Sequence, residues 1–178
     1  MSSVRPPQPQ VSATPIAIRI ATPDDAPLVR AILEDSYPAL MATAYPAELL
    51  ARAMPLITRP HPRLLAGGTY YLAEVDGEIA GCGGWSFWEP GGGAVETGLA
   101  HIRHFAVCES WSGRGVGRAL YDRCESEARA AGADRFEVQS SLNGEAFYAR
   151  LGFERIGPID VPMGPDLVFP SILMRRSI

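Results

Sequence analysis

The chain has 178 residues, 47% of them hydrophobic, which favours one compact domain with a sizeable core over two domains. Acidic residues outnumber basic ones, the formal net charge is −4, and no basic run occurs, so the sequence predicts no nucleic-acid partner. The cysteines Cys82, Cys108 and Cys124 are odd in number and lack a C-x-x-C spacing, which argues against a disulfide framework and a zinc site. We therefore expect a cytoplasmic protein without a metal ion.

The N-terminal residues 1–15 are rich in Ser, Pro and Gln and contain no apolar core. This composition predicts a disordered tail rather than a signal peptide or a membrane anchor. No apolar run approaches the roughly 20 residues that a membrane-spanning helix needs. We expect a soluble protein with no membrane partner, whose single folded domain covers residues 16–178.

The first elements are predicted from periodicity and from proline. Ile16, Ile18 and Ile20 alternate with smaller or polar residues, the pattern of a half-buried strand. A helix is predicted from about 23 to 36, because a threonine, a proline and two acidic residues form a typical start. A second helix is predicted from 46 to 54, and a loop should follow it, since prolines lack the amide that a helix interior requires; they are Pro55, Pro60 and Pro62.

The middle of the chain predicts a β-hairpin and a further strand. Strands over 70–75 and 78–88 flank Asp76-Gly77, a dipeptide favoured in two-residue hairpin turns. Three glycines at 91–93 mark a flexible break, and residues 100–107 form the next strand.

The last third alternates helices and strands. Apolar residues recur at helical spacing from Val116 to Ala131, and Gly132 follows as a helix-ending residue. A strand around Phe136 and Val138 comes next, and the remaining predicted elements are a short helix over 143–151 and strands over 153–157 and 168–174. This order predicts a mixed α/β fold layered around one sheet.

A glycine-rich loop joins the strand over 100–107 to the amphipathic helix. Its free backbone amides and the positive end of the helix dipole suit a phosphate or pyrophosphate, and nearby arginines add charge-assisted bonds. The sequence fits neither a dinucleotide fingerprint, because Arg118 stands where the last glycine is needed, nor a P-loop. A glycine-rich connection without a ligand is the alternative. The loop consists of Ser112, Gly113, Arg114, Gly115, Val116, Gly117 and Arg118.

Two segments carry a resemblance to a known family. The strand 101–107 with the loop 112–117 resembles the central R/Q-x-x-G-x-G/A motif of the GCN5-related N-acetyltransferase (GNAT) superfamily. Residues 141–153, S-L-N-G-E-A-F-Y-A-R-L-G-F, resemble its second motif. The resemblance implies a three-layer fold whose mostly antiparallel sheet, of about seven strands, is splayed at the CoA site and flanked by helices. Ser112 replaces the family's first Arg or Gln; we expect its amide to suffice and Arg114 to supply the charge.

The resemblance also implies a donor and residues that hold it. The donor would be acetyl-CoA, with the loop 112–118 on its pyrophosphate. The backbone groups of Phe105, Ala106 and Val107 would pair with the pantetheine amides as an added strand does. Asn143 precedes a helix and is a candidate N-cap; the resemblance adds a hydrogen bond from it to the same arm, and the two roles are compatible.

Two residues are candidates for proton transfer. By resemblance, Tyr148 lies beside the CoA sulfur, where its phenol would protonate the leaving thiolate; the alternative is a packing tyrosine. His101 occupies a strand position at which some family members carry a catalytic glutamate, and an imidazole suits a base at neutral pH. Strand alternation would put His101 on one face with 103, 105 and 107, and His104 on the other. The alternatives are an ordinary strand histidine and deprotonation through a water chain.

These observations predict an N-acetyltransferase that moves acetyl from acetyl-CoA to a primary amine of a small molecule by direct attack in a ternary complex. A CoA-binding sensor or regulatory module without turnover is the alternative. The resemblance also suggests a homodimer. The identity of the amine is not encoded in any motif, and aromatic residues that might line its pocket are more often core residues: Tyr37, Tyr45, Trp85, Phe87 and Trp88.

Overall fold

The computed structural model describes residues 15–178. The tail predicted over 1–15 lies outside this part of the chain, apart from Pro15. Seven strands are present: β1 (Ile16–Ile20), β2 (Tyr70–Val75), β3 (Glu78–Ser86), β4 (Leu99–Val107), β5 (Arg135–Ser141), β6 (Glu154–Pro162) and β7 (Val168–Ser177). The helices are α1 (Ala26–Met41), α2 (Ala47–Ile57), α3 (Pro62–Ala66), α4 (Val116–Ala130) and α5 (Glu145–Arg150). Within 15–178, no helix is both long and apolar enough to cross a membrane.

The strands form one sheet in the order β1-β2-β3-β4-β5-β7-β6. Every neighbouring pair is antiparallel except β4 and β5, which are parallel because α4 connects them across one face. The mostly antiparallel, seven-stranded mixed α/β fold predicted from the sequence is confirmed.

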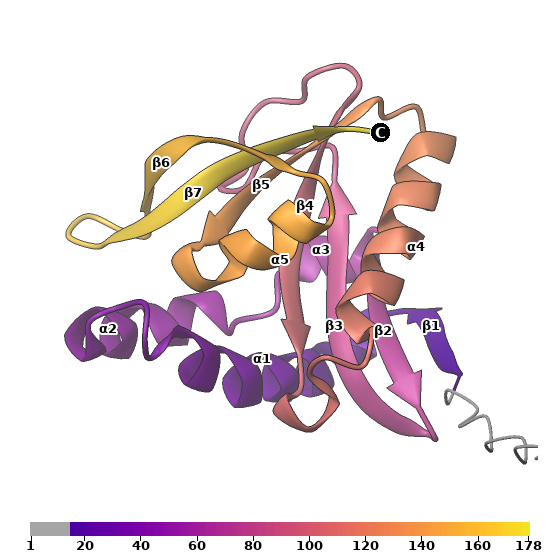
Figure 1. The fold of residues 1–178 in the computed structure, drawn as a ribbon, viewed down its shortest axis with the longest axis horizontal. Helices are drawn as coiled ribbons and strands as arrows, with labels where there is room; N and C mark the ends of the chain where they lie inside the picture. The colour runs from indigo at the N-terminus through magenta and orange to yellow at the C-terminus, as the bar shows by residue number, and fades with distance from the viewer. Residues whose placement is uncertain (1–14) are drawn as a thin grey trace, which may run out of the picture.

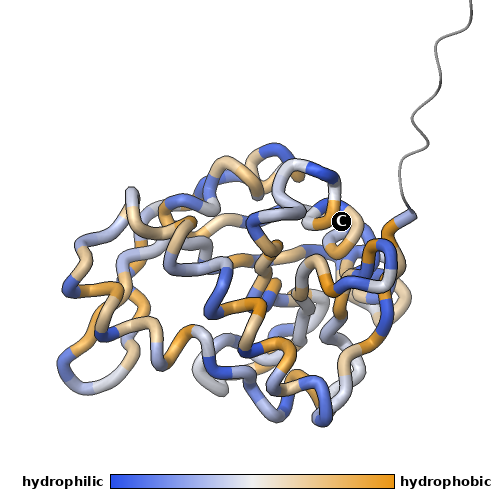
Figure 2. Tube along the Cα trace, turned by 90° about the horizontal axis from the view of Figure 1, so that it is seen from below, coloured by the Kyte–Doolittle hydropathy of each residue, from blue (hydrophilic) through white to orange (hydrophobic). Residues whose placement is uncertain are grey.

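Helices cover both faces of the sheet. Figure 1 shows α4 and α5 on the near side and α3 behind the strands. One apolar core lies under α4 and α5, and a second lies between the sheet and α1 to α3. Hydrophobic and hydrophilic stretches alternate every few residues along the chain in Figure 2, as expected for elements that bury only one face.

The first two helices continue past their predicted ends and contain prolines. α1 continues past 36 to Met41 with Pro38 inside it, and α2 continues past 54 to Ile57 with Pro55 inside it. Both prolines are exposed, so the missing hydrogen bond faces solvent. A short helix, α3, replaces part of the predicted loop. Burial of residues such as Tyr37 and Ile57 on the inner faces outweighs the cost of the prolines, about 3 kcal/mol each.

A β-bulge interrupts β4 at His104. The pairing with β3 passes from Ala106 opposite Cys82 to Arg103 opposite Gly84, so β4 carries one extra residue, and His104 has φ +47°. A bulge reverses the side-chain alternation beyond it. The prediction that 101, 103, 105 and 107 share one face is therefore wrong: Phe105 and Val107 pack with the α4 side, as Ile102 does.

Candidate active site

β4 and β5 pair over only three residues and then separate. Their register runs Leu99 to Arg135, Ala100 to Phe136 and His101 to Glu137, and no further pair follows among the described residues. Beyond this point the two strands diverge (Figure 1). The gap leaves both inner edges without a strand partner, which makes it a natural place for an extended ligand.

A cavity of about 620 Å³ fills this gap. It is a size typical of small-molecule sites. One part is lined by the glycine loop, the end of β5 and the start of α5, including Ser112, Gly117, Ser140 and Tyr148. The other part is lined by the opposite face of the fold: Tyr37, Leu40 and Met41 of α1, Ile57 of α2, and Val161, Met163 and Phe169 near the β6–β7 turn.

The glycine loop presents free amides to the cavity. The first backbone hydrogen bond of α4 runs from the amide of Ala119 to the carbonyl of Gly115, at 2.9 Å. Gly115 is the N-cap residue with φ +87°, a left-handed conformation that favours glycine. Among the described residues, the amides of Gly113 and of 115–118 form no backbone hydrogen bond and are left for a ligand, and the helix dipole adds about 0.3–1 kcal/mol for an anion there. The expectation for the Ser112 amide is wrong, because it donates to the carbonyl of Glu109 at 3.1 Å; the amide of Arg114 likewise donates to Trp111 at 3.4 Å.

Gly117 lines the cavity and also allows two helices to pack closely. A Cβ there would stand 3.0 Å from the ring of Phe147, so the absence of a side chain allows α4 and α5 to approach closely. A large substitution at Gly117 would therefore disturb packing and ligand binding together.

The two loop arginines differ in position. Arg118 lines the cavity, and its Nε donates to Asp122 Oδ1 at 2.8 Å on the exposed face of α4. Arg114 stacks over Trp111, 5.1 Å from the ring centroid, and is not among the cavity-lining residues. Of the predicted loop residues, the cavity is lined by Ser112, Gly113, Gly115, Val116, Gly117 and Arg118.

The β4 edge of the gap is held from below by α1. Phe105, Ala106 and Val107 all line the cavity. Tyr37 Oη donates to the carbonyl of Phe105 at 3.3 Å, and Ser36 Oγ donates to the carbonyl of Val107 at 2.9 Å. These bonds fix the strand edge where it leaves its partner.

Asn143 lines the cavity with an acceptor that has no partner. It lies in a 3-10 turn over Leu142–Gly144, and the N-cap of α5 is Gly144, with no side-chain cap. The predicted N-cap role is therefore wrong. Its Oδ1 is buried and makes no hydrogen bond with the described residues. A buried acceptor without a partner is costly, which indicates a ligand donor at this point.

Tyr148 lies on α5 against the cavity. It is 7% exposed and packs among Phe105, Phe147 and Phe153. Burial raises the pKa of its phenol well above the ordinary value, so the hydroxyl stays protonated at neutral pH. A donor at neutral pH is what a leaving thiolate requires.

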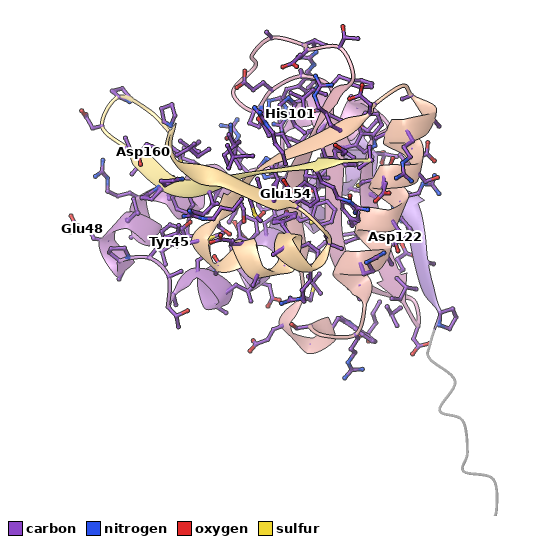
Figure 3. All side chains as sticks on the ribbon, turned by 45° about the horizontal axis from the view of Figure 1, so that its top comes forward. Tyr45, Glu48, His101, Asp122, Glu154 and Asp160 are labelled. Carbon is purple, nitrogen blue, oxygen red and sulfur yellow. The ribbon has the colours of Figure 1, made fainter. Side chains whose placement is uncertain are left out.

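His101 lies at the apex of the gap but does not line the cavity. It is 3% exposed, and its Nδ1 is 3.7 Å from Oε1 of Glu137, the last residue paired across from it. Glu137 also accepts a hydrogen bond from Arg175 Nε at 2.8 Å. Burial lowers the pKa of His101 despite the nearby carboxylate, so the imidazole is neutral at pH 7. Figure 3 shows His101 among interior side chains, whereas Asp122 lies out on α4.

Sequence reasoning did not identify the residues of the second part of the cavity. Tyr37, for which the sequence favours a core position, does line the cavity. Arg103 also lines it and was not singled out. These residues carry no motif, because they come together only through the fold.

Comparison with known proteins agrees with the two motifs. The model of the acetyltransferase (GNAT) family matches residues 28–153. The protein named IAA acetyltransferase of Azospirillum brasilense is 29% identical over 112 residues, which cover 61% of this chain and 67% of that protein.

Solved structures share the fold. A GCN5-related N-acetyltransferase of Rhodopseudomonas palustris superposes with a TM-score of 0.74 at 24% identity, over 95% of this chain and 99% of that one. The PaiA N-acetyltransferase of Thermoplasma acidophilum, solved with coenzyme A, gives a TM-score of 0.70 at 14% identity, over 92% and 99% of the two chains. The family match covers well over half of the sequence. The chain therefore belongs to the acetyltransferase (GNAT) family, and it is an enzyme of the acyltransferase class.

Proposed function

We propose that this enzyme transfers acetyl from acetyl-CoA to a primary amine of a small molecule by direct attack in a ternary complex. The observation that carries the proposal is the continuous cavity, which runs from the glycine loop through the β4–β5 gap to α1 and α2. A donor entering from one side and an acceptor entering from the other would meet at the gap. Family membership favours an enzyme over a CoA-binding sensor.

Direct attack is favoured by the state of the cysteines. Burial raises the pKa of Cys108 and raises that of Cys82 to about 12, and it also raises the pKa of Cys124. A thiol with a raised pKa is a poor nucleophile at neutral pH. The acetyl group would therefore pass directly to the amine, without an acetyl-cysteine intermediate.

The residues present fit acetyl-CoA as the donor. The free amides of Gly113 and of 115–118 would hold the pyrophosphate, and Arg118 would add charge. The edge of Phe105, Ala106 and Val107 would align the pantetheine arm. The unpartnered Oδ1 of Asn143 would accept a hydrogen bond from an amide of that arm. Arg114, stacked on Trp111, would act at the rim by long-range charge.

Deprotonation of the amine is assigned to His101. An amine with a pKa near 10 is almost fully protonated at pH 7, so exposing its lone pair costs roughly 4 kcal/mol. His101 is neutral and stands beside the apex of the gap. Since it does not line the cavity, the proton would reach it through one water molecule. A water chain to solvent is the alternative route.

Tyr148 is assigned the donation of a proton to the leaving thiolate. As the amine nitrogen bonds to the thioester carbon, the carbon–sulfur bond breaks and its electron pair goes to sulfur. The phenol would donate its proton to that thiolate and recover one from solvent after product release. Its raised pKa supports this direction, because the hydroxyl is protonated before the step.

A homodimer stays a prediction. β6 is the edge strand of the sheet and carries an exposed apolar side chain, Ile156 at 53% exposure. Pairing of such an edge with a second copy would cover it. Light scattering during gel filtration distinguishes one copy from two.

The experiment for the proposed function is a thiol-release assay with acetyl-CoA and a panel of amines. The panel contains amino acids, polyamines, aminoglycosides and a lysine-containing peptide, and mass spectrometry identifies the acetylated products. We expect release of CoA matched mole for mole by an N-acetylated small molecule. Acetylation of the peptide alone, or CoA release without any acetylated amine, would contradict the proposal.

A further inference from the structure

A buried arginine lies on the acceptor side of the cavity without a counter-ion. The Arg103 side chain extends from β4 and is 5% exposed. Its Nη1 donates to Ser86 Oγ at 2.9 Å and more weakly to the Trp88 carbonyl at 3.4 Å. No carboxylate of the described residues pairs with it or contributes to its pKa.

The charge nearest to Arg103 is positive and does not neutralise its guanidinium. Its guanidinium stacks on one side of Trp88, 4.0 Å from the ring centroid, and Arg63 lies 4.6 Å from the same ring. The positive charge of Arg103 contributes to lowering the pKa of all three histidines in the chain, His61, His101 and His104. Burial lowers the pKa of Arg103 itself to about 10.

Such a group is costly to the free protein. Removing a cation from water without a paired anion is strongly unfavourable, and buried charges are normally paired. Two hydrogen bonds to neutral acceptors and one aromatic face replace only part of the lost hydration. The arrangement therefore indicates that an anion arrives with a ligand.

The guanidinium still has donors to offer. Nε and Nη2 form no hydrogen bond with the described residues, and neither is among the buried atoms that lack a partner. Both atoms therefore keep contact with open space. Arg103 lines the cavity together with Pro90, which lies two residues beyond Trp88, so the cavity reaches the part of the fold that holds the guanidinium.

This anion site is separate from the expected phosphate site. Arg103 precedes the bulge and points to the face covered by α1 to α3, where it meets Ser86 and Trp88. The glycine loop follows the end of β4 and leads into α4, which covers the other face. The remaining surface of the acceptor side is mostly apolar: Tyr37, Leu40, Met41, Ile57, Val161 and Met163.

We propose that Arg103 binds a carboxylate of the acceptor, so that the acceptor is an amine that also carries a carboxylate and an apolar body, as an apolar amino acid does. The inference rests on the proposed function and narrows its substrate class. The planar fork of an arginine matches a carboxylate through two parallel hydrogen bonds. The apolar wall opposite would then bury the body of the acceptor and turn its amine toward the gap.

The test compares amines that differ only in the carboxylate. The probes are L-phenylalanine with 2-phenylethylamine, L-leucine with 3-methylbutylamine, and 6-aminohexanoate with hexylamine. O-phosphoethanolamine with ethanolamine tests for a phosphate instead. We expect at least one carboxylate probe to exceed its partner in kcat/KM by about 10- to 100-fold, the range for a charge-assisted pair. Equal rates within every pair, or a preference for the phosphate alone, would overturn the proposal.

Variants assign the effect to Arg103. Arg103→Gln should abolish the preference by lowering kcat/KM for the carboxylate probes about 10- to 100-fold more than for their carboxylate-free partners. Arg103→Lys should restore part of it. Arg63→Gln is the matched control, since it removes an exposed arginine that contacts the same Trp88 ring and does not line the cavity, and it should keep the preference. A preference that survives in Arg103→Gln would overturn the assignment.

A binding measurement separates this inference from the proposed function and needs no turnover. In the presence of CoA, N-acetyl-L-phenylalanine should raise the Tm of the wild type, and N-acetyl-2-phenylethylamine should raise it less. Arg103→Gln should remove the difference, while calorimetry shows its affinity for acetyl-CoA unchanged. Turnover of amines without a carboxylate effect in either assay would overturn the inference and leave the proposed function intact. Absence of acetyl-CoA binding by the wild type would instead overturn the proposed function.

Discussion

The hydroxyl of Tyr45 accepts a hydrogen bond from the backbone amide of Leu142 at 2.7 Å. The same hydroxyl donates to the carbonyl of Pro170 at 2.8 Å, and its ring stacks on Phe169 at 4.4 Å. One side chain between α1 and α2 thus joins the turn after β5 to β7 (Figure 3). Because Asn143 follows Leu142, this contact also sets the position of the unpartnered acceptor in the cavity.

Tyr45→Phe should therefore weaken both the fold and donor binding. The substitution leaves the Leu142 amide and the Pro170 carbonyl without their partner, which should lower the free energy of unfolding by about 1–3 kcal/mol. We expect a higher Kd for acetyl-CoA as well. Denaturant unfolding and calorimetry measure the two effects. Tyr121→Phe is the control, since Tyr121 lies on α4 away from the cavity and loses only a hydrogen bond from Arg176 of β7, so the Kd should stay unchanged. An unchanged Kd in Tyr45→Phe would show that the turn holds without this contact.

Tyr148→Phe tests the proton donor. Removing the hydroxyl should reduce kcat by about 100-fold or more, the usual contribution of a general acid, with little change in the Kd for acetyl-CoA. Stopped-flow thiol release measures the chemical step, and calorimetry measures binding. A variant with wild-type kcat would limit Tyr148 to packing among its phenylalanine neighbours.

If His101 is the base, kcat should decrease at acidic pH. The base must be neutral, and burial lowers its pKa, so kcat at saturating substrates should fall only as the pH drops below the ordinary histidine value near 6.5. Glu137 raises the pKa of His101, so Glu137→Gln should move this decrease to lower pH. His101→Gln should lower kcat and remove this decrease. An unchanged profile in His101→Gln would assign deprotonation to the water chain.

Stability should also fall with acid. All three histidines have lowered pKa values in the folded state, and that of His104 falls to about 4, mainly through burial. Below pH 6.5 the histidines are protonated in the unfolded chain but stay neutral in the folded chain. The free energy of unfolding therefore decreases as the pH falls. For His104 the loss approaches about 3 kcal/mol near pH 4. Calorimetric Tm values from pH 7 to 4 measure it, and His104→Asn, which tolerates φ +47°, should flatten the curve. A Tm independent of pH over this range would contradict the burial of these groups.

Arg103→Met should not destabilise the free protein. Replacing an uncompensated buried cation with an apolar side chain of similar length should leave the free energy of unfolding equal to the wild type, or raise it by up to about 4 kcal/mol. Arg176→Met is the control, because Arg176 pairs with Glu125 at 3.1 Å, and its loss should destabilise. A loss above about 1 kcal/mol in Arg103→Met would indicate a structural role in place of ligand binding.

Local signals predicted much of the fold. The Asp76-Gly77 hairpin was read correctly because a two-residue turn needs left-handed residues, and both have positive φ, +53° and +80°. The glycine loop was found for a similar reason. The helix ends at Ser36 and Met54 were wrong, because an exposed proline costs less than the burial gained by the turn around it.

The acceptor side could not be predicted. The bulge at His104 has no glycine to mark it, because histidine is one of the few other residues that adopt positive φ, and the bulge decides which side chains of β4 face α1. Arg103 looks like an ordinary strand arginine until the fold shows that no carboxylate of residues 15–178 forms an ion pair with it. Contacts between segments as distant as Tyr45 and Pro170 arise only from the complete fold.

The most direct test of the account is calorimetric titration of acetyl-CoA into the wild type, Ser112→Asp and Ser110→Asp. Ser112 lines the cavity with an extended backbone that accepts any residue, so aspartate there places a negative charge at the expected pyrophosphate without strain. Ser110 is exposed two residues earlier and does not line the cavity. The account predicts binding by the wild type and Ser110→Asp and a loss of at least about tenfold in Ser112→Asp. Equal affinity in all three proteins, or no binding by the wild type, would contradict it.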